Sequence, residues 1–166
     1  MTYQPPPPPP ASFLPPAPPR PSRAGGLVLL LAGLLGSASV WLPWFAAMGQ
    51  SLNLQQFADT LGDFTPDGLD DPNVWLYSSI AGGAIAVLFG LIGLAGSKGA
   101  NVTAGVFGLV AAVALAYPPV WMMTGAELDN MGEILDILSF GYYAATVSAV
   151  LALVGAITAF AGSGKR

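Results

Sequence analysis

Four long apolar runs without a charged residue dominate this sequence and restrict what it can fold into. They cover residues 27–48, 74–96, 102–123 and 142–161. Each contains about 20 residues, which as a helix would cross the roughly 30 Å hydrocarbon core of a bilayer. A single charge at mid-span would cost about 2.5–3.5 kcal/mol, and none is present. The runs predict an all-α membrane protein built as a four-transmembrane-helix bundle.

The charged residues predict the orientation of these spans. They make up only 8% of the chain, against about 25% in soluble domains. All five cations fall on one side: Arg20 and Arg23 precede the first run, Lys98 lies in the second connection, and Lys165 and Arg166 follow the fourth. The nine acidic residues fall in the two other connections. By the positive-inside rule, both termini are cytoplasmic in a multi-pass plasma-membrane protein.

The N-terminal region has a second interpretation, because Arg23, the following leucines and the small residues at 36–38 also fit a cleavable signal peptide. The apolar run continues through Trp44 and Phe45, however, which favours a true span.

Residues 1–24 are rich in proline, and we expect a disordered cytoplasmic tail ahead of a membrane domain at residues 25–166. Two interpretations of this tail remain open. It is either a ligand for a cytoplasmic polyproline-binding partner, with Phe13, Leu14 and Arg20 as side-chain contacts, or a spacer.

Each acidic connection carries apolar residues at helical spacing, which predicts a short amphipathic outer-loop helix. These residues are Leu54, Phe57, Leu61 and Phe64 in the first connection, and Leu128, Met131, Leu135 and Leu138 in the second. Thr124 and Glu127 fit a capping box that would begin the second helix.

Small residues recur every four positions in the last three runs, and this spacing predicts flat helix faces that pack closely in lipid. The predicted helix-packing residues are Gly82, Ala86, Gly90, Ala104, Gly108, Ala112, Ala116, Ala144, Ser148, Ala152 and Ala156. The first run has a shorter series and more leucine, so we expect it at the edge of the bundle. Four tryptophans near the outer ends are predicted interface anchors: Trp41, Trp44, Trp75 and Trp121.

Few side chains offer reactive chemistry. The chain has no cysteine and no histidine, which removes thiolate chemistry, imidazole bases and most zinc sites. The four runs contain no Asp, Glu, Lys, Arg or His, which argues against coupled transport. We therefore predict no catalytic residue, cofactor or metal, and no nucleic-acid partner.

The acidic connections allow two other interpretations. Asp67, Asp70 and Asp71 have oxygen ligands that suit a divalent cation, and Asp63 with Glu133 could form a carboxylate pair. Solvation of an exported surface is the simpler explanation of these acids.

The stretch Trp41-Leu42-Pro43-Trp44, followed by a glycine-rich second run, resembles small bacterial four-span membrane proteins of the actinobacterial type. In that largely uncharacterised group an LPW element ends the first span, and proline-rich tails are common. The resemblance implies the four-span fold and a bacterial plasma membrane, but no activity.

The favoured function is a non-catalytic accessory or scaffold protein within a plasma-membrane complex, partnered by a membrane protein or by its own copies. The alternative is a small oligomeric channel or transporter with an acidic outer vestibule. A membrane enzyme that uses the outer carboxylates is a third interpretation.

Overall fold

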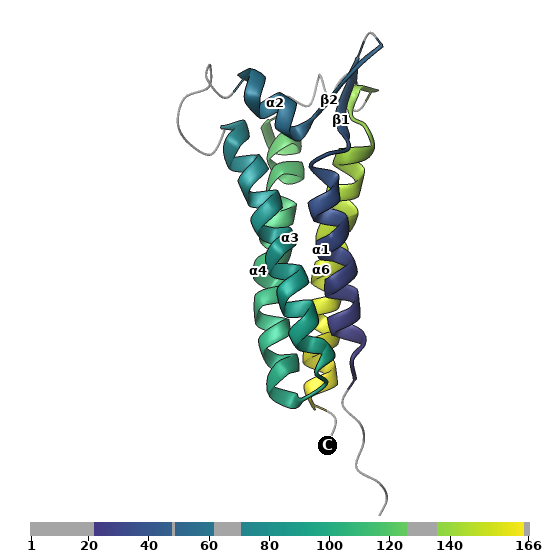
Figure 1. Cartoon of the computed structure of the whole chain (residues 1–166), viewed down its shortest axis with the longest axis vertical. Helices are drawn as coiled ribbons and strands as arrows, with labels where there is room; N and C mark the ends of the chain where they lie inside the picture. Colours follow the sequence, from purple (N-terminus) through teal and green to yellow (C-terminus); the bar gives the residue numbers. More distant parts are fainter. Residues whose placement is uncertain (1–21, 48, 62–70, 126–135, 165–166) are drawn as a thin grey trace, which may run out of the picture.

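The computed structural model describes residues 22–47, 49–61, 71–125 and 136–164. Four helices lie side by side along its long axis (Figure 1): α1 (Ala24–Ser39), α3 (Pro72–Leu94), α4 (Lys98–Gly125) and α6 (Phe140–Gly164). Three of them, α3, α4 and α6, are long and apolar enough to cross a membrane. The described chain is therefore a mainly helical protein compatible with several membrane passes.

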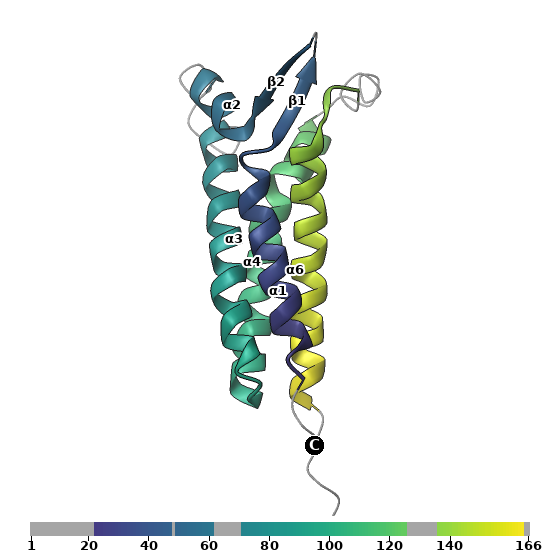
Figure 2. The same ribbon diagram turned by 45° about the vertical axis from the view of Figure 1, so that its right-hand side comes forward.

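The four helices alternate in direction along the chain (Figures 1 and 2). Helix α1 packs against α3 and α6, and α4 packs against the same two helices. Each of α1 and α4 therefore has the other as its diagonal neighbour. The turn between α3 and α4 is short and contains Gly96 with a φ of 67°, which is a left-handed conformation that glycine adopts at no steric cost.

Helix α1 is shorter than the sequence predicts. The apolar run extends to residue 48, but the helix ends at Ser39 after 16 residues, or about 24 Å. The prediction of one helix from 27 to 48 is wrong, because Pro43–Ala47 forms strand β1. Proline has no backbone N–H to continue a helix, and hydropathy alone does not separate an apolar helix from an apolar strand.

Strand β1 pairs with β2 (Gln50–Asn53) as an antiparallel hairpin, which the sequence did not predict. Gly49 provides the turn with a φ of 76°. Helix α2 (Leu54–Leu61) follows directly. Asn53 and Gln56 begin it by exchanging side-chain to backbone hydrogen bonds of 2.8 and 3.1 Å, which is a capping box.

The predicted amphipathic helix of the first connection agrees in type with α2. Leu54 and Ala58 are buried on one face, while Asp59 and Thr60 are exposed. Phe64, which the predicted stripe also included, lies outside the described residues.

The predicted start of the second amphipathic helix at Thr124 is wrong, because Thr124 belongs to the last turn of α4. Its hydroxyl donates to the Val120 and Trp121 carbonyls at 3.1 and 3.2 Å, as a helical threonine does, and so is not an N-cap. Of the remaining predicted stripe, Leu128, Met131 and Leu135 lie outside the described residues, and Leu138 is buried beside β1.

Candidate functional site

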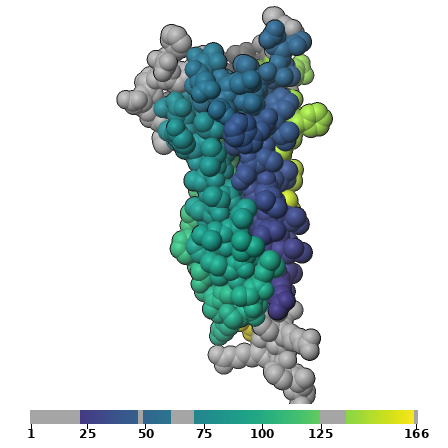
Figure 3. Space-filling view, in the orientation of Figure 1, coloured from purple at the N-terminus to yellow at the C-terminus, as the bar shows by residue number. Residues whose placement is uncertain are grey.

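The interior of the bundle is the candidate functional feature, and its first part is a glycine seam between α1 and α3. Gly26 and Gly33 of α1 meet Gly83 and Gly90 of α3. A Cβ atom at Gly33 would lie 2.6 Å from both the Gly83 carbonyl oxygen and the Val87 nitrogen. The two backbones are thus in direct contact, and Figure 3 shows the surfaces of the two helices adjoining each other. Contact this close lets dispersion replace the hydrophobic effect that lipid does not supply.

Two leucines fill the centre of the bundle. Leu29 of α1 lies against Gly108 of α4 and Gly155 of α6, and its side chain is fully buried. Leu115 of α4 is also fully buried, and it fills the space left by two other glycines. Those glycines are Gly36 of α1 and Gly82 of α3. Leu29 extends from α1 to α4 and α6, and Leu115 extends from α4 to α1 and α3. The two side chains therefore fill the centre of the bundle at two levels along its axis.

The predicted packing residues occupy the interior and fall into three groups. Gly82 faces α4 and Gly90 faces α1, so one predicted stripe on α3 serves two partners. The next group is buried within the bundle: Ala86, Ala104, Gly108, Ala112, Ser148, Ala152 and Ala156. The last two, Ala116 and Ala144, are half-buried.

Helix α1 is packed into the bundle as closely as the other three helices, which corrects the prediction that it lies at the edge. It packs closely against both α3 and α6, and its buried positions include Gly26, Gly33 and Leu29. A four-residue search for small residues misses Gly26 and Gly33 because they are seven residues apart. The same spacing separates Gly83 from Gly90, and this matching pair of repeats is the signal that could have identified the seam.

A second hydrophobic cluster covers one end of the bundle. Trp44 of β1 is fully buried, and its indole N–H donates to the Ser39 carbonyl at 2.8 Å. Tyr142 packs edge-on against this ring, with the centroids 6.2 Å apart. Gly141 leaves the space that Trp44 occupies. The indole therefore satisfies a carbonyl at the end of α1 and joins that helix to the start of α6.

An aromatic stack links α2 to the same cluster. Phe57 of α2 lies between Phe45 of β1 and Trp75 of α3, at centroid distances of 4.6 and 6.0 Å. Leu138 pairs with Phe45 as an isolated bridge, and the Ser139 N–H donates to the Trp44 carbonyl at 2.9 Å. The hairpin, α2 and the start of α6 thus form one cap over the helices (Figure 2).

The four predicted tryptophan anchors are placed differently from one another. Trp41 is 66% exposed, as an interface anchor requires. Trp75 and Trp121 are half-buried, with Trp121 packed against Tyr117 at 5.9 Å. Trp44 is buried in the cap, which differs from the exposed position that the sequence predicts. Hydropathy and position do not distinguish a buried tryptophan from an anchor, since both lie at the end of a span.

At the opposite end, Asn101 of α4 is fully buried. Its amide nitrogen donates to the Ser22 carbonyl at 3.1 Å, and Gly162 of α6 packs against both residues. Arg23 lies over Gly96 at the turn between α3 and α4. The chain that follows residue 21 is thus tied to three other parts of the bundle. Asn101-Val102-Thr103 matches a glycosylation sequon, but the burial of Asn101 leaves it no accessible acceptor.

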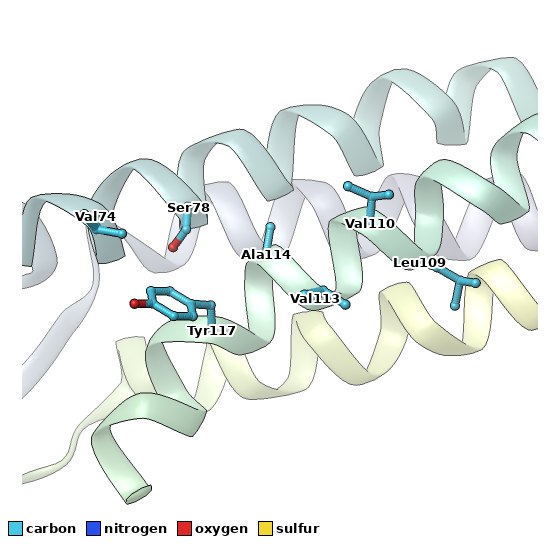
Figure 4. A pocket seen from close by; sticks show the side chains of 7 residues that line it. All are labelled: Val74, Ser78, Leu109, Val110, Val113, Ala114 and Tyr117. Atoms are coloured by element: carbon cyan, nitrogen blue, oxygen red, sulfur yellow. The ribbon is translucent and has the colours of Figure 1, made fainter. Parts of the chain in front are cut away.

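Shallow apolar grooves run along the surface of α4. One of them lies between α3 and α4, has a volume of about 590 Å³, and places Ser78 and Tyr117 near one end (Figure 4). A groove of about 480 Å³ lies between α4 and α6. Val113, which is 71% exposed, borders both. The walls are almost entirely apolar, so these grooves offer mainly packing surface.

The acidic residues form no metal-binding group in the described part of the chain. Asp71 caps α3 by accepting hydrogen bonds from the Asn73 backbone N–H and side-chain amide at 2.8 and 3.0 Å. Asp63, Asp67, Asp70 and Glu133, which the two alternative interpretations require, lie outside the described residues.

No protein-family model, curated protein or solved structure matches this chain. The arrangement of its own residues is therefore the basis for the function proposed below.

Proposed function

We propose that this chain is a non-catalytic accessory or scaffold protein of a bacterial plasma-membrane complex. In this proposal α1 is a fourth span, α2 and the hairpin lie outside, and both termini are cytoplasmic. The observation that carries the proposal is the interior, which consists of glycine, alanine and serine fitted around Leu29 and Leu115. Among the described residues no Asp, Glu, Lys or Arg is buried. Such an interior supports close packing and leaves no group for chemistry in the membrane.

The packed interior argues against a channel through a single bundle. Leu29 and Leu115 occupy the axis with fully buried side chains, so a conducting path through one bundle would require both to move. A channel would instead form between copies of the chain. Ion flux through liposomes that contain only this protein therefore separates the two proposals.

The basic residues support the proposed orientation. Arg23 and Lys98 lie at the end of the bundle that holds the α3–α4 turn, while Asp59 and Asp71 lie at the capped end. Cations at one membrane face and acids at the other are typical of a cytoplasmic and an external side, respectively.

Because the chain contains no cysteine, single cysteines can map this orientation. We expect a membrane-impermeant maleimide to label Asp59→Cys in intact cells and Gly99→Cys only after permeabilisation. Both positions are exposed in the structure. An N-terminal epitope tag should be protected from external protease, which tests whether α1 crosses the membrane. Labelling of Gly99→Cys in intact cells would show that the topology is the reverse of the proposed one. Cleavage of the tag by external protease would show that α1 does not cross the membrane.

The proline-rich segment supports a role in recruitment, with a spacer as the alternative. Extended proline-rich chains bind aromatic grooves of partner domains at little entropic cost. The hydrogen bond from Asn101 to the Ser22 carbonyl sets where the bundle begins, so a deletion meant to test the tail should end at residue 20.

Affinity capture tests the accessory role directly. From crosslinked native membranes in mild detergent, we expect a C-terminally tagged chain to recover one stoichiometric membrane complex. Deletion of residues 2–20 should reduce recovery if the tail recruits the partner, and should leave it unchanged if the tail is a spacer. A variant with the same tail length and every proline in residues 5–19 replaced by serine is the matched control. Recovery of the tagged chain alone, as monomer or homo-oligomer, would contradict the accessory role.

A further inference from the structure

Ser79 of α3 is a buried polar residue whose hydroxyl makes no hydrogen bond with any described residue. Its side chain is 1% exposed, and its Oγ has no partner in the part of the chain that the structure describes. Four other serines in these helices, Ser39, Ser78, Ser148 and Ser163, each donate to the carbonyl three residues earlier, at 2.6–2.9 Å. This back-bonding is the usual way a helical serine satisfies its hydroxyl. Ser79 does not make this bond.

The register between α3 and α4 brings Ser79 to about the same level along the bundle as Pro118. A Cβ atom at Gly93 would lie 3.2 Å from the Ala104 Cβ atom. Eleven residues nearer the cap, a Cβ atom at Gly82 would lie 3.0–3.1 Å from Ala114 and Leu115. The two antiparallel helices therefore keep a constant register over these eleven residues. Three residues from Gly82 toward the cap, α3 carries Ser79. Its counterpart three residues beyond Leu115 is Pro118, which is also fully buried.

Prolines remove hydrogen-bond donors from α4 at this level. Pro118 and Pro119 lie inside α4, and neither has a backbone N–H. In a regular helix those two groups would donate to the carbonyls of Ala114 and Leu115. A proline ring also displaces the carbonyl four residues earlier, which widens the local spacing. The helix thus carries two carbonyl acceptors without their usual donors, at residues about one turn along the bundle from the level of Ser79.

We propose that a water molecule binds inside the bundle at this level and bridges the Ser79 hydroxyl to the carbonyls of Ala114 and Leu115. Buried waters typically make about three hydrogen bonds to groups that the protein leaves unpaired. Water both donates and accepts, so it satisfies the two carbonyls and the hydroxyl together. A metal cation would accept electron pairs from the same oxygens, but no acidic side chain is buried among the described residues to balance its charge.

This site would explain how α4 continues through two successive prolines without breaking. The bound water takes the place of the missing N–H donors, as water does in other helices of membrane proteins that contain proline. Ser79 is then a positioning residue for the water.

The sign of the effect of Ser79→Ala tests the proposal. If Ser79 holds the water, this substitution should lower the unfolding temperature by about 2–4 °C, the shift expected for one net hydrogen bond in a protein of this size. If Ser79 is merely a buried hydroxyl without a partner, its removal should raise the unfolding temperature, since a desolvated group is lost. Ser148→Ala is the matched control, because its hydroxyl is satisfied within its own helix. We expect its shift to be smaller than that of Ser79→Ala.

A second substitution makes the test specific to the proline step. Pro118→Ala restores an N–H that can donate to Ala114, so the loss caused by Ser79→Ala should shrink in that background. If Ser79→Ala lowers the unfolding temperature by the same amount with and without Pro118→Ala, the proposed water bridge is wrong. Should Pro118→Ala fail to fold, nuclear Overhauser contacts between water and the Ser79 β-protons in nanodiscs give an independent readout. Their absence would overturn the proposal, as would stabilisation by sodium relative to choline that depends on Ser79, since that result would indicate a cation site.

Discussion

Replacing Trp44 with alanine is expected to destabilise the protein by about 3–5 kcal/mol, the range for removing a large aromatic side chain from a packed core. Trp44 is fully buried and fills the space beside Gly141. Its indole also donates a hydrogen bond to the Ser39 carbonyl, where α1 ends. Its loss would leave a cavity between α1 and α6 and remove one of the two hydrogen bonds that the Ser39 carbonyl accepts, the other coming from the Leu42 N–H at 3.2 Å.

The measurement is the free energy of unfolding, obtained by titration with a denaturing detergent and followed by far-UV circular dichroism. Trp41→Ala is the control, because Trp41 is three residues away and 66% exposed. We expect Trp41→Ala to change the free energy of unfolding in detergent by about 0.5 kcal/mol or less. Equal losses for the two variants would show that Trp44 is not part of a packed cap.

Gly33→Leu is expected to have the second large effect, near the upper end of the roughly 1–3 kcal/mol that overpacking costs. A side chain here would meet backbone atoms of Gly83 and Val87 at 2.6 Å. Backbone atoms do not move aside as the end of a flexible side chain can. The substitution therefore forces α1 and α3 apart along the glycine seam.

Gly99→Leu is the matched control for this variant, because Gly99 is also helical and a Cβ atom there would meet nothing within 4 Å. Both substitutions remove a glycine, so both gain the same helix propensity of up to about 1 kcal/mol. Only Gly33→Leu adds a clash, and the difference in their free energies of unfolding measures the seam. If Gly33→Leu is as stable as Gly99→Leu, the contact between α1 and α3 is not as close as described.

The long apolar helices could be predicted from the sequence, since hydropathy and length locate α3, α4 and α6 to within a few residues. The end of α1 could not, because Trp44 and Phe45 are equally apolar in a helix or a strand. What decides the outcome is tertiary: Trp44 fits beside Gly141 and bonds to Ser39, and those contacts involve residues far apart in the chain.

The small residues of the interior could be predicted from the sequence, but the side chains that they contact on other helices could not. Small residues at four-residue spacing indicated close packing on α3, α4 and α6. The residues that determine the arrangement are Leu29 and Leu115, which fit into glycines of other helices. A sequence shows which positions are small, but it does not show which large side chain fills each space. That depends on the register between helices, which neighbouring residues in one run do not specify.

The contact between Asn101 and the Ser22 carbonyl has a mechanical consequence. Ser22 is the first described residue, and it is held by α4 through Asn101 and by α6 through Gly162. A pull on the preceding chain would be shared among these helices instead of unwinding α1 from its first turn. A force exerted by a partner bound to the N-terminal segment would therefore be transmitted to the whole bundle. The segment could then serve as a firmly attached tether.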